Sequence, residues 1–316
     1  MPAIYGLVTV LLLVWSLGPA YAESVSAPPP TAAFASLPRI ESIQLSPSGR
    51  HLAVLRNHEG QTFLDTQTLT GQDVHRVVST DNRDYIITWF RWVNDERLLV
   101  SVRFAATRDA IDSIETRLMA VNRDGTEPIP NLFKQSAFPS IFGKKHFPQF
   151  QDRLVGTIPG DPRHVLLALD LEHPNAPDVY KVDVYSGDRQ LIQANPSSQP
   201  DPRVILHWIA DRAGTVRAGV GQFQTGVHAI FKQPESSLWR QLADYDLAKE
   251  TGLVPLAFDV DPAWLYVRDQ HRGKAAIFKL NVLDRSMDRV LVVADPKFDL
   301  NGELVYAPGR KKVVGV

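Results

Sequence analysis

The stretch Ser46-Pro47-Ser48-Gly49-Arg50-His51-Leu52-Ala53-Val54 places a polar turn directly before an alternating apolar run. Pro and Gly in a turn, followed by apolar residues at every second position, predict a turn that leads into a β-strand. Related stretches recur along the chain as VNDERLLVSV from Val93, GDPRHVLLAL from Gly160, DRAGTVRAGV from Asp211, DVDPAWLYVR from Asp259 and APGRKKVVGV from Ala307. Apart from one longer gap, they lie about fifty residues apart, which indicates structural repeats.

A second kind of segment follows each of the first five stretches and has the pattern strand, polar turn, strand. These segments are TFLDTQTLTGQDVHRVV, RLMAVNRDGTEPIPNLF, VYKVDVYSGDRQLI, HAIFKQPESSLWRQL and AIFKLNVLDRSMDRVLV. Residues typical of hairpin turns fall between the two strands, namely Thr70, Gly71, Asp124, Gly125, Ser186, Gly187 and Asp284. A short apolar segment such as IESIQLSP or ITWFRWVND also precedes the first turn, so each period contains about four strands.

Four antiparallel strands in each period predict an all-β fold, a β-propeller of four-stranded blades. A single four-stranded sheet has two apolar faces, and only stacking against neighbouring sheets buries both. Residues 37–316 contain about five such blades and the start of a sixth. Because the sixth repeat opens with the strand-like KKVVGV and then the chain stops, we expect an incomplete propeller and a fragment of a longer protein.

Two segments have other possible structures. Residues 238–252 (LWRQLADYDLAKETG) are compatible with a short helix ended by Gly252, which we interpret as a connection between blades. Residues 133–150 (FKQSAFPSIFGKKHFPQF) are rich in Phe, Pro and Lys, and we interpret them as an insertion or a crossing between blades.

The N-terminal residues have the pattern of a secretory signal peptide. Residues 1–22 contain the apolar run LVTVLLLVWSL and end in Ala20-Tyr21-Ala22, which predicts cleavage after Ala22. The alternative is a membrane anchor, but the run is short for a bilayer of about 30 Å. We therefore expect a periplasmic or secreted protein without stable membrane insertion after cleavage, with residues 23–36 as a linker rich in Pro and small residues.

Composition excludes several classes of function. The 316 residues have a net charge of -1, which argues against a nucleic-acid partner. The chain contains no cysteine, so disulfides, thiolate catalysis and Cys-based metal sites are excluded.

Residues that often carry chemistry are scattered, and the sequence predicts no catalytic, cofactor-binding or metal-binding residue. The histidines are His51, His58, His75, His146, His164, His173, His207, His228 and His271, and they form no compact metal-ligand motif. The close carboxylate pairs are Asp81/Asp84, Asp170/Glu172, Asp183/Asp188 and Asp259/Asp261. We expect these carboxylates to cap turn amides rather than to form a glycosidase or Ca²⁺ site. We expect Trp89, Trp92, Trp208, Trp239 and Trp264 to pack between blades and no cofactor to be bound. The cluster at 143–146 (GKKH) is interpreted as a solvated loop, with a contact surface as the alternative, and the cluster at 309–312 (GRKK) as the polar turn before the last strand.

The opening FASLPRIESIQLSPSGRHLAVLRN and the last repeats, from GLVPLAFDVDPAWLYVRD onward, resemble the propeller of secreted bacterial peptidases of the prolyl oligopeptidase family. The members concerned are acylaminoacyl-peptidase and dipeptidyl-aminopeptidase-like enzymes. The resemblance implies a non-catalytic propeller that gates access of peptide substrates to a following α/β-hydrolase domain with a Ser-Asp-His triad. This sequence contains no Gly-x-Ser-x-Gly, so that domain and its nucleophile are absent from it.

The chain also lacks the Glu-Glu dipeptide with which dipeptidyl-peptidase members hold the substrate amine. Two other functions stay open. One is a stand-alone periplasmic propeller, similar to TolB-like modules, that acts as a protein-binding scaffold. The other is a propeller enzyme such as a quinoprotein or a glycoside-active protein, although the repeats lack the Trp- and Gly-rich pattern of quinoprotein blades.

Overall fold

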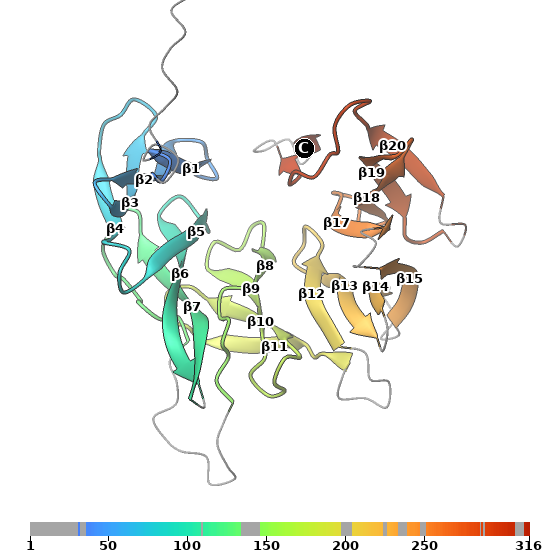
Figure 1. Ribbon diagram of the computed structural model, residues 1–316, viewed down its shortest axis with the longest axis horizontal. Helices are drawn as coiled ribbons and strands as arrows, with labels where there is room; N and C mark the ends of the chain where they lie inside the picture. The colour runs from blue at the N-terminus through green and yellow to red at the C-terminus, as the bar shows by residue number, and fades with distance from the viewer. Residues whose placement is uncertain are drawn as a thin grey trace, which may run out of the picture. The chain divides into compact units, whose positions relative to one another are not determined.

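The computed structural model describes residues 31, 36–108, 110–133, 146–196, 204–223, 226–232, 239–246, 251–284, 286, 288–306 and 313–316. The chain divides into two units, Met1–Leu37 and Pro38–Val316, and the strands named below lie in the second. The predicted signal peptide, residues 1–22, lies outside the described residues, as does most of the predicted linker, residues 23–36. The second unit is built of antiparallel β-sheets (Figure 1), which confirms the predicted all-β fold.

The sheets follow one another along the chain, and we number them in that order. Sheet 1 contains β1 (Ile40–Leu45), β2 (His51–His58), β3 (Gln61–Thr68) and β4 (His75–Thr80). Sheet 2 contains β5 (Ile86–Trp92), β6 (Arg97–Arg108) and β7 (Ile111–Asn122). Sheet 3 contains β8 (Leu154–Thr157), β9 (His164–Leu169), β10 (Asp178–Asp183) and β11 (Arg189–Gln193).

Sheets 4 to 6 complete the series. Sheet 4 contains β12 (Val204–Ala210), β13 (Val216–Phe223), β14 (Gly226–Lys232), β15 (Trp239–Asp246) and β16 (Thr251–Gly252). Sheet 5 contains β17 (Val254–Phe258), β18 (Trp264–His271), β19 (Lys274–Asn281) and β20 (Arg289–Val293). Sheet 6 contains β21 (Val305–Tyr306) and β22 (Val313–Gly315). Five sheets and the opening of a sixth are the arrangement that the repeats predict.

Sheet 2 has three strands where the repeat predicts four. The expected fourth strand, EPIPNLF, is reduced to a single bridge between Ile129 and Ala120 and one hydrogen bond from Leu132 N to Leu118 O (2.8 Å). Pro128 and Pro130 flank Ile129, and proline has no N–H to donate to a strand ladder. The segment therefore follows the path of a fourth strand without forming one.

Residues 238–242 were also predicted as the second strand of the hairpin HAIFKQPESSLWRQL, and the pairing of β14 with β15 confirms that prediction. The interpretation of residues 238–252 as a helical connection between blades is wrong. The described part of this segment forms β15 and β16, the outer strands of sheet 4. Apolar residues of this segment are buried on both sides of the sheet. The ring centres of Trp239 and Trp208 are 5.5 Å apart on the side of sheet 3. Leu242 packs on the side of sheet 5, in the cluster that contains Phe258. Burial on two sides favours a strand between two neighbouring sheets over a helix with one apolar face. Most of the predicted insertion, residues 134–145, lies outside the described residues.

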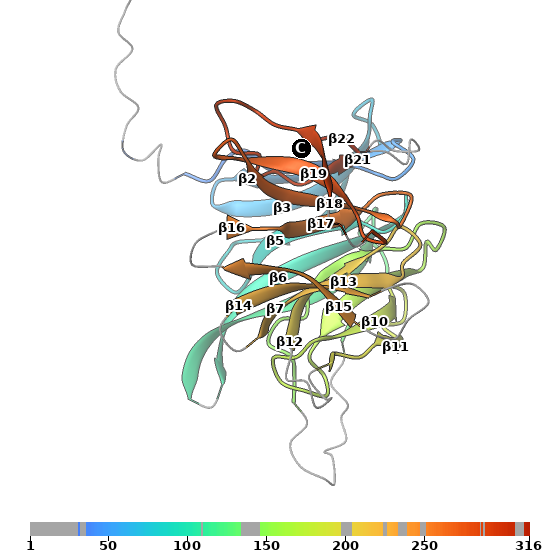
Figure 2. The same ribbon diagram turned by 90° about the vertical axis from the view of Figure 1, so that its right-hand side faces the viewer.

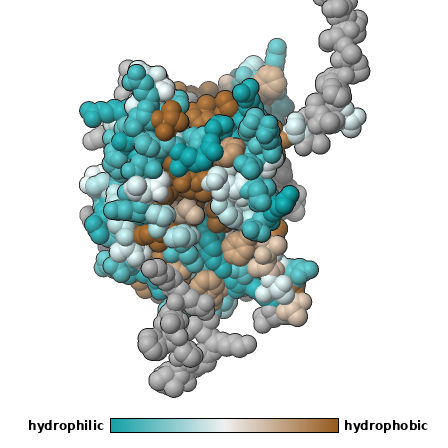
Figure 3. All heavy atoms as spheres, turned by 90° about the vertical axis from the view of Figure 1, so that its left-hand side faces the viewer, coloured by the Kyte–Doolittle hydropathy of each residue, from teal (hydrophilic) through white to brown (hydrophobic). Residues whose placement is uncertain are grey.

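Sheets 2 to 4 each pack one face on the preceding sheet and the other on the following sheet. For every sheet we call the face on the side of the preceding sheet its backward face and the other its forward face. Leu55 and Leu64 of sheet 1 share an apolar cluster with Phe90 and Val100 of sheet 2. Similar clusters join sheet 2 to sheet 3, sheet 3 to sheet 4 and sheet 4 to sheet 5. On the outer surface that Figure 3 shows, hydrophobic residues lie among a majority of hydrophilic ones. The apolar side chains are thus concentrated between sheets.

One buried cation lies within this apolar stack. Arg97, at the start of β6, is 1% exposed and reaches from sheet 2 to sheet 3. Its Nε and Nη2 donate to Val184 O at 3.2 and 2.9 Å, and its Nη1 donates to Asn122 Oδ1 and Glu127 O, both at 2.9 Å. The guanidinium carbon also lies 4.8 Å from the centre of the Tyr185 ring. Burial lowers the pKa of Arg97, and the carbonyl acceptors and the ring offset the loss of hydration.

We predict that Arg97→Met destabilises the protein by about 2 kcal/mol or more, because the carbonyls of Val184 and Glu127 lose their donors. Arg103→Met is the matched control, since Arg103 lies on the same strand and is exposed. We expect the control to change stability by less than about 0.5 kcal/mol. Urea denaturation of both variants measures the difference, and equal effects would show that Arg97 does not join the two sheets.

Candidate functional site

The two ends of each sheet carry different connections. In sheet 1, the turns between β1 and β2 and between β3 and β4 lie at one end, which we call the turn end. The β2–β3 turn and the connection into the next sheet lie at the other end, which we call the crossing end. Because neighbouring strands are antiparallel, a chain enters the first strand and leaves the fourth at the same end. A segment that precedes or follows a four-stranded sheet therefore attaches at its crossing end.

At least one member of each predicted carboxylate pair caps a turn, as expected. Asp183 Oδ1 accepts hydrogen bonds from Tyr185 N at 2.7 Å and Ser186 N at 3.3 Å. Asp261 Oδ1 accepts from Ala263 N at 2.9 Å. Asp81, Asp170 and Asp259 each accept from a nearby backbone N–H in the same way. These carboxylates hold the local backbone, which is the role that Asp favours in turns.

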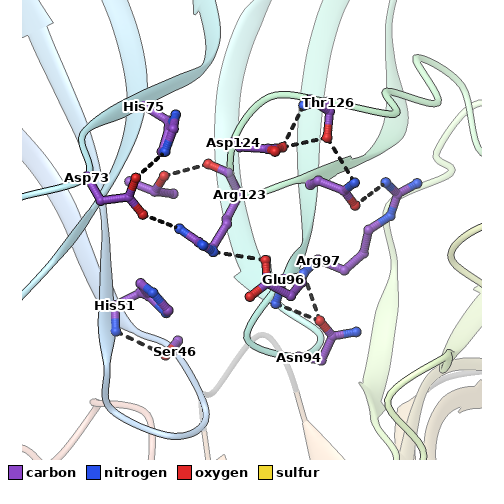
Figure 4. Close-up of polar contacts among 12 residues, drawn as sticks. Ser46, His51, Asp73, His75, Asn94, Glu96, Arg97, Arg123, Asp124 and Thr126 are labelled. Atoms are coloured by element: carbon purple, nitrogen blue, oxygen red, sulfur yellow. Dashed lines mark hydrogen bonds and ion pairs between the residues drawn. The ribbon is translucent and has the colours of Figure 1, made fainter.

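A polar network joins sheets 1 and 2 at the turn end (Figure 4). Asp73 of sheet 1 lies between His75, whose Nε2 is 2.8 Å from Asp73 Oδ1, and Arg123 of sheet 2, whose Nη1 donates to Oδ2 at 2.8 Å. Arg123 Nε donates to Glu96 Oε2 at 2.9 Å. Hydrogen bonds from Arg123 and His75 hold the pKa of Asp73 below its usual range, and the contact with Asp73 raises the pKa of Arg123. The network crosses from one sheet to the next, so we interpret it as a structural contact.

Two further hydrogen bonds at the turn end repeat this pattern. Ser48 N of sheet 1 donates to Asp95 Oδ1 of sheet 2 at 3.0 Å. Asn94 Nδ2 of sheet 2 donates to Pro162 O of sheet 3 at 2.6 Å, and to the hydroxyl of Tyr185 at 3.0 Å. The first turn of one sheet is thus bonded to the first turn of the next. The turn end is occupied by contacts between sheets.

The crossing end carries the longest hairpin of the described residues. β6 and β7 are twelve residues each and extend past the neighbouring strands (Figure 2). Their register is unbroken from Arg97↔Asn122 to Arg108↔Ile111. Near the tip, Ile111 is 70% exposed and Ile114 is 55% exposed. The hairpin therefore presents apolar side chains to solvent at the end where further segments attach.

A group of polar side chains, which we call the hairpin cluster, lies along this hairpin from its middle to its tip. Its members are Ser101, Arg108, Glu115, Thr116, Arg117 and Asp152. Glu115, 6% exposed, is paired with Arg108 Nε at 2.5 Å and with Arg117. Asp152 accepts from Ser101 Oγ at 2.7 Å and from Thr116 Oγ1 at 2.6 Å.

The hairpin cluster fixes the segment 146–152 beside β7. Arg108 Nη1 donates to Phe147 O at 2.8 Å, and the Arg117 guanidinium carbon lies 4.8 Å from the Phe147 ring centre and 5.1 Å from that of Phe104. Thr116 N also donates to Gln149 O at 3.0 Å. The C-terminal part of the predicted insertion and the hairpin are therefore one rigid surface feature. Its pairing of Arg with aromatic rings and its exposed isoleucines suit contact with an extended peptide or a neighbouring domain.

Sequence reasoning did not identify the hairpin cluster. Glu115 and Arg117 are two residues apart on β7, which is the spacing of an ordinary pair of solvent-facing strand residues. Nothing in the sequence links them to Arg108, on the preceding strand, or to Asp152, which lies 35 residues after Arg117. Only the register of two twelve-residue strands and the return of residues 146–152 bring them together. The charges of Glu115 and Arg117 on β7 are the one signal in the sequence for the hairpin cluster. They do not reveal that Arg108 and Asp152 belong to it.

The other residues singled out in the sequence lie mostly in structural positions. His51 and His164 are each the first residue of the second strand of their sheet, and His146 Nε2 lies 2.9 Å from Asp170 Oδ2. Trp92 and Trp208 are buried between sheets, as expected. Residues 143–145 and 309–312 lie outside the described residues. Among the residues described, no three His, Asp or Glu side chains are grouped so that they hold a metal ion.

Comparison with known proteins supports the resemblance to the propeller region of a peptidase. No model of a known protein family matches the sequence. Dipeptidyl aminopeptidase BIII from Pseudoxanthomonas mexicana is 24% identical over 281 residues, which are 88% of this chain and 37% of that protein. The match confirms the resemblance to the propeller region of prolyl oligopeptidase family peptidases. The chain spans little more than a third of the length of this relative.

Two solved structures are similar in fold. The propeller domain of the Trilobed protease from Pyrococcus furiosus is 15% identical with a TM-score of 0.39, covering 82% of this chain and 86% of that chain. TolB from Acinetobacter baumannii is 10% identical with a TM-score of 0.39, covering 77% and 51%. Both TM-scores are below 0.5, so the resemblance stated above rests on the sequence match. Within the described residues, no helix is long and apolar enough to cross a bilayer.

We predict that Glu115→Gln destabilises the protein by about 1 to 3 kcal/mol, because a buried partner of two arginines loses its charge. Burial alone would raise the pKa of Glu115, but the hydrogen bonds from Arg108 and Arg117 outweigh it and the net pKa is lowered from 4.5. The carboxylate therefore stabilises the fold at neutral pH, and this contribution is lost as pH falls below 4.5.

Denaturation between neutral and acid pH measures this effect, and Glu115→Gln should lose less stability on acidification than the unmodified protein. Glu59→Gln is the control, since the Glu59 side chain is 84% exposed. An identical acid sensitivity in the Glu115→Gln variant would contradict the assignment.

Proposed function

We propose that this chain is the substrate-gating propeller of an exported serine peptidase, and that a following α/β-hydrolase domain performs peptide hydrolysis. The observation that carries the proposal is the sequence match along 88% of the chain to a dipeptidyl aminopeptidase of which the chain covers 37%. The propeller repeats account for the matched region, and the remaining length of that relative leaves room for a catalytic domain.

The residues of this chain agree with a non-catalytic part. The sequence contains no Gly-x-Ser-x-Gly, the turn that presents the nucleophile in α/β-hydrolases. At the turn end, Asp73 and Arg123 are engaged in a contact between sheets 1 and 2, and Asp161 and Asp183 are paired with cations of their own sheet. Peptide hydrolysis by such a protein therefore requires a nucleophile from outside residues 1–316.

The crossing end supports the gating role. A domain that follows a completed four-stranded sheet attaches at this end, where the β6–β7 hairpin and the hairpin cluster lie. In the proposed protein, this hairpin, held by hydrogen bonds to residues 147 and 149, limits which peptides reach the catalytic site. Export is part of the proposal and rests on the apolar run and the Ala20-Tyr21-Ala22 end of residues 1–22.

The decisive experiment compares two proteins, residues 23–316 and the product of the complete reading frame. We expect the complete product to hydrolyse chromogenic peptide substrates and to react with a fluorophosphonate serine probe, and residues 23–316 to do neither. A reading frame without Gly-x-Ser-x-Gly, or hydrolysis by residues 23–316 alone, would overturn the proposal. The first of these outcomes would favour a protein-binding scaffold.

We further predict that Ile111→Ser combined with Ile114→Ser changes the ratio of kcat/KM for long and short peptides by about tenfold, which corresponds to about 1.4 kcal/mol. The reason is that the exposed apolar tip of the hairpin contacts the longer peptides. Leu69→Ser combined with Val74→Ser is the matched control, because these residues are 56% and 60% exposed at the turn end. Equal changes in both double variants would place the selecting surface elsewhere.

A further inference from the structure

The strand β6 has one edge that is only partly covered. β5 pairs with β6 as far as Ile86↔Arg103, whereas β7 pairs with it up to Arg108↔Ile111, at the tip of the hairpin. Residues 104–108 of β6 therefore have a neighbouring strand on one side only, and we call their other side the free edge. Figure 2 shows this part of the hairpin extending past the other strands. At about 3.4 Å per residue, five residues of edge span about 17 Å.

Two residues carry the unpaired groups of the free edge. In an antiparallel strand, the N–H and C=O groups of successive residues point alternately to the two sides. Thr116 N donates to Gln149 O, which lies outside the β6–β7 pair, so the even-numbered residues of β7 face away from β6. By the same alternation, the N–H and C=O groups of Ala105 and Thr107 point away from β7. Among the described residues, none pairs with them on that side.

The side chains beside the free edge leave room for an added strand. Ala105 is exposed on the forward face of sheet 2, directly opposite Ile114 of β7, which is 55% exposed. Because alanine is small, a side chain of an added strand placed beside Ala105 reaches Ile114. An apolar side chain is favoured there, since it removes exposed apolar surface from water.

Arg103 adds a positive charge at the base of the free edge. It is exposed, and no carboxylate of the described residues pairs with it. Residues two apart on a strand lie on the same face, so Arg103 and Ala105 share the forward face. An added strand with an apolar side chain at Ala105 places its neighbouring side chain of that face at Arg103. A carboxylate at this position finds an unpaired guanidinium.

The length of the free edge distinguishes between possible occupants. A stable contact between two copies of the chain buries about 1,000 Å² or more, and two edges of five residues joined alone bury much less. An extended peptide needs only the edge, because main-chain hydrogen bonds give its affinity and pockets at alternate positions give its specificity. The free edge also belongs to the crossing end, where segments that precede or follow a sheet attach. A peptide therefore fits this edge better than a second copy does.

We propose that the free edge of β6 binds an extended peptide as an added strand in line with β5. The backbone groups of Ala105 and Thr107 bond to the main chain of the peptide. Ile114 contacts an apolar side chain, and Arg103 pairs with a carboxylate two positions away from it. The inference deepens the proposed function and rests on it for the source of the peptide, which is the substrate of the peptidase.

Peptide binding tests the inference. The probe is the fluorescein-labelled peptide Thr-Glu-Thr-Val-Thr-Glu-Thr, which has a glutamate two positions from the valine on either side and so fits both strand directions. Fluorescence anisotropy measures its binding to the product of the complete reading frame, after treatment with a fluorophosphonate that stops hydrolysis by a serine nucleophile. N-methylation of each peptide position in turn gives the decisive pattern. We expect weaker binding at every second position, because only alternate N–H groups of an added strand face β6.

Proline substitution gives the matched test on the side of the protein. Ala105→Pro removes an N–H from the free edge, and proline is tolerated at strand positions whose N–H faces solvent. Asp112→Pro is the control, because the N–H of Asp112 faces the opposite, outer side of the same hairpin. We expect Ala105→Pro to raise the Kd of the probe by about fivefold or more, and Asp112→Pro by less than about twofold. Thr107→Pro replaces Ala105→Pro if that variant does not fold.

Three outcomes would overturn the inference. The first is no saturable binding, or equal weakening by the two proline variants. The second is a uniform effect of N-methylation along the peptide, which shows recognition through side chains alone. The third is a dimer in light scattering that Ala105→Pro abolishes, which shows that a second copy occupies the edge. The expected binding pattern in a product without a serine nucleophile would contradict only the proposed function, whereas hydrolysis without the pattern would contradict only this inference.

Discussion

Burial of both faces of every sheet is the constraint on which this structure depends. A four-stranded antiparallel sheet whose strands are apolar on both sides cannot be stable alone, because one face always remains in water. The described sheets solve this by sharing apolar clusters pairwise along the chain. The strands consequently show apolar runs rather than strict alternation, as in Val165–Leu169, where every residue is buried. Stability is therefore a sum of contacts between neighbours, and a sheet with one neighbour is the weakest part.

Apolar contact alone does not set the angle between two sheets, and the polar contacts at the turn end add that specificity. Arg97 reaches the carbonyl of Val184, Asn94 reaches that of Pro162, and Asp73 bonds Arg123. Each bond joins one sheet to the next and has a narrow range of geometry. The network around Asp73 is exposed and contributes orientation more than energy, whereas Arg97 is buried and its loss leaves acceptors without donors.

The repeats predicted the fold because the signals that define a blade are local. Turn residues such as Gly125 and Gly187 and the apolar periods between them lie within a few residues of one another, and the structure confirms them. What the repeats did not predict depends on contacts distant in sequence. The full extent of β15, and β16 after it, was not predicted, because burial of β15 on both sides depends on two neighbouring sheets. The hairpin cluster was missed because Glu115 and Asp152 meet only through the register of β6 with β7 and the return of the chain.

The two ends of the sheets carry different kinds of connection. Under the proposed function, this difference explains how a repetitive scaffold can carry a selective surface. At the turn end the connections are short and bonded to their neighbours, so changes there disturb the stacking of sheets. At the crossing end the chain passes between sheets, and an extended hairpin or a longer connection adds material without changing the contacts within the stack. The β6–β7 hairpin shows this directly, because its first six residues bury in the core and its tip carries Ile111 into solvent. Under the proposed gating function, selectivity can therefore change by substitution of tip residues at the crossing end while the stacked sheets stay the same.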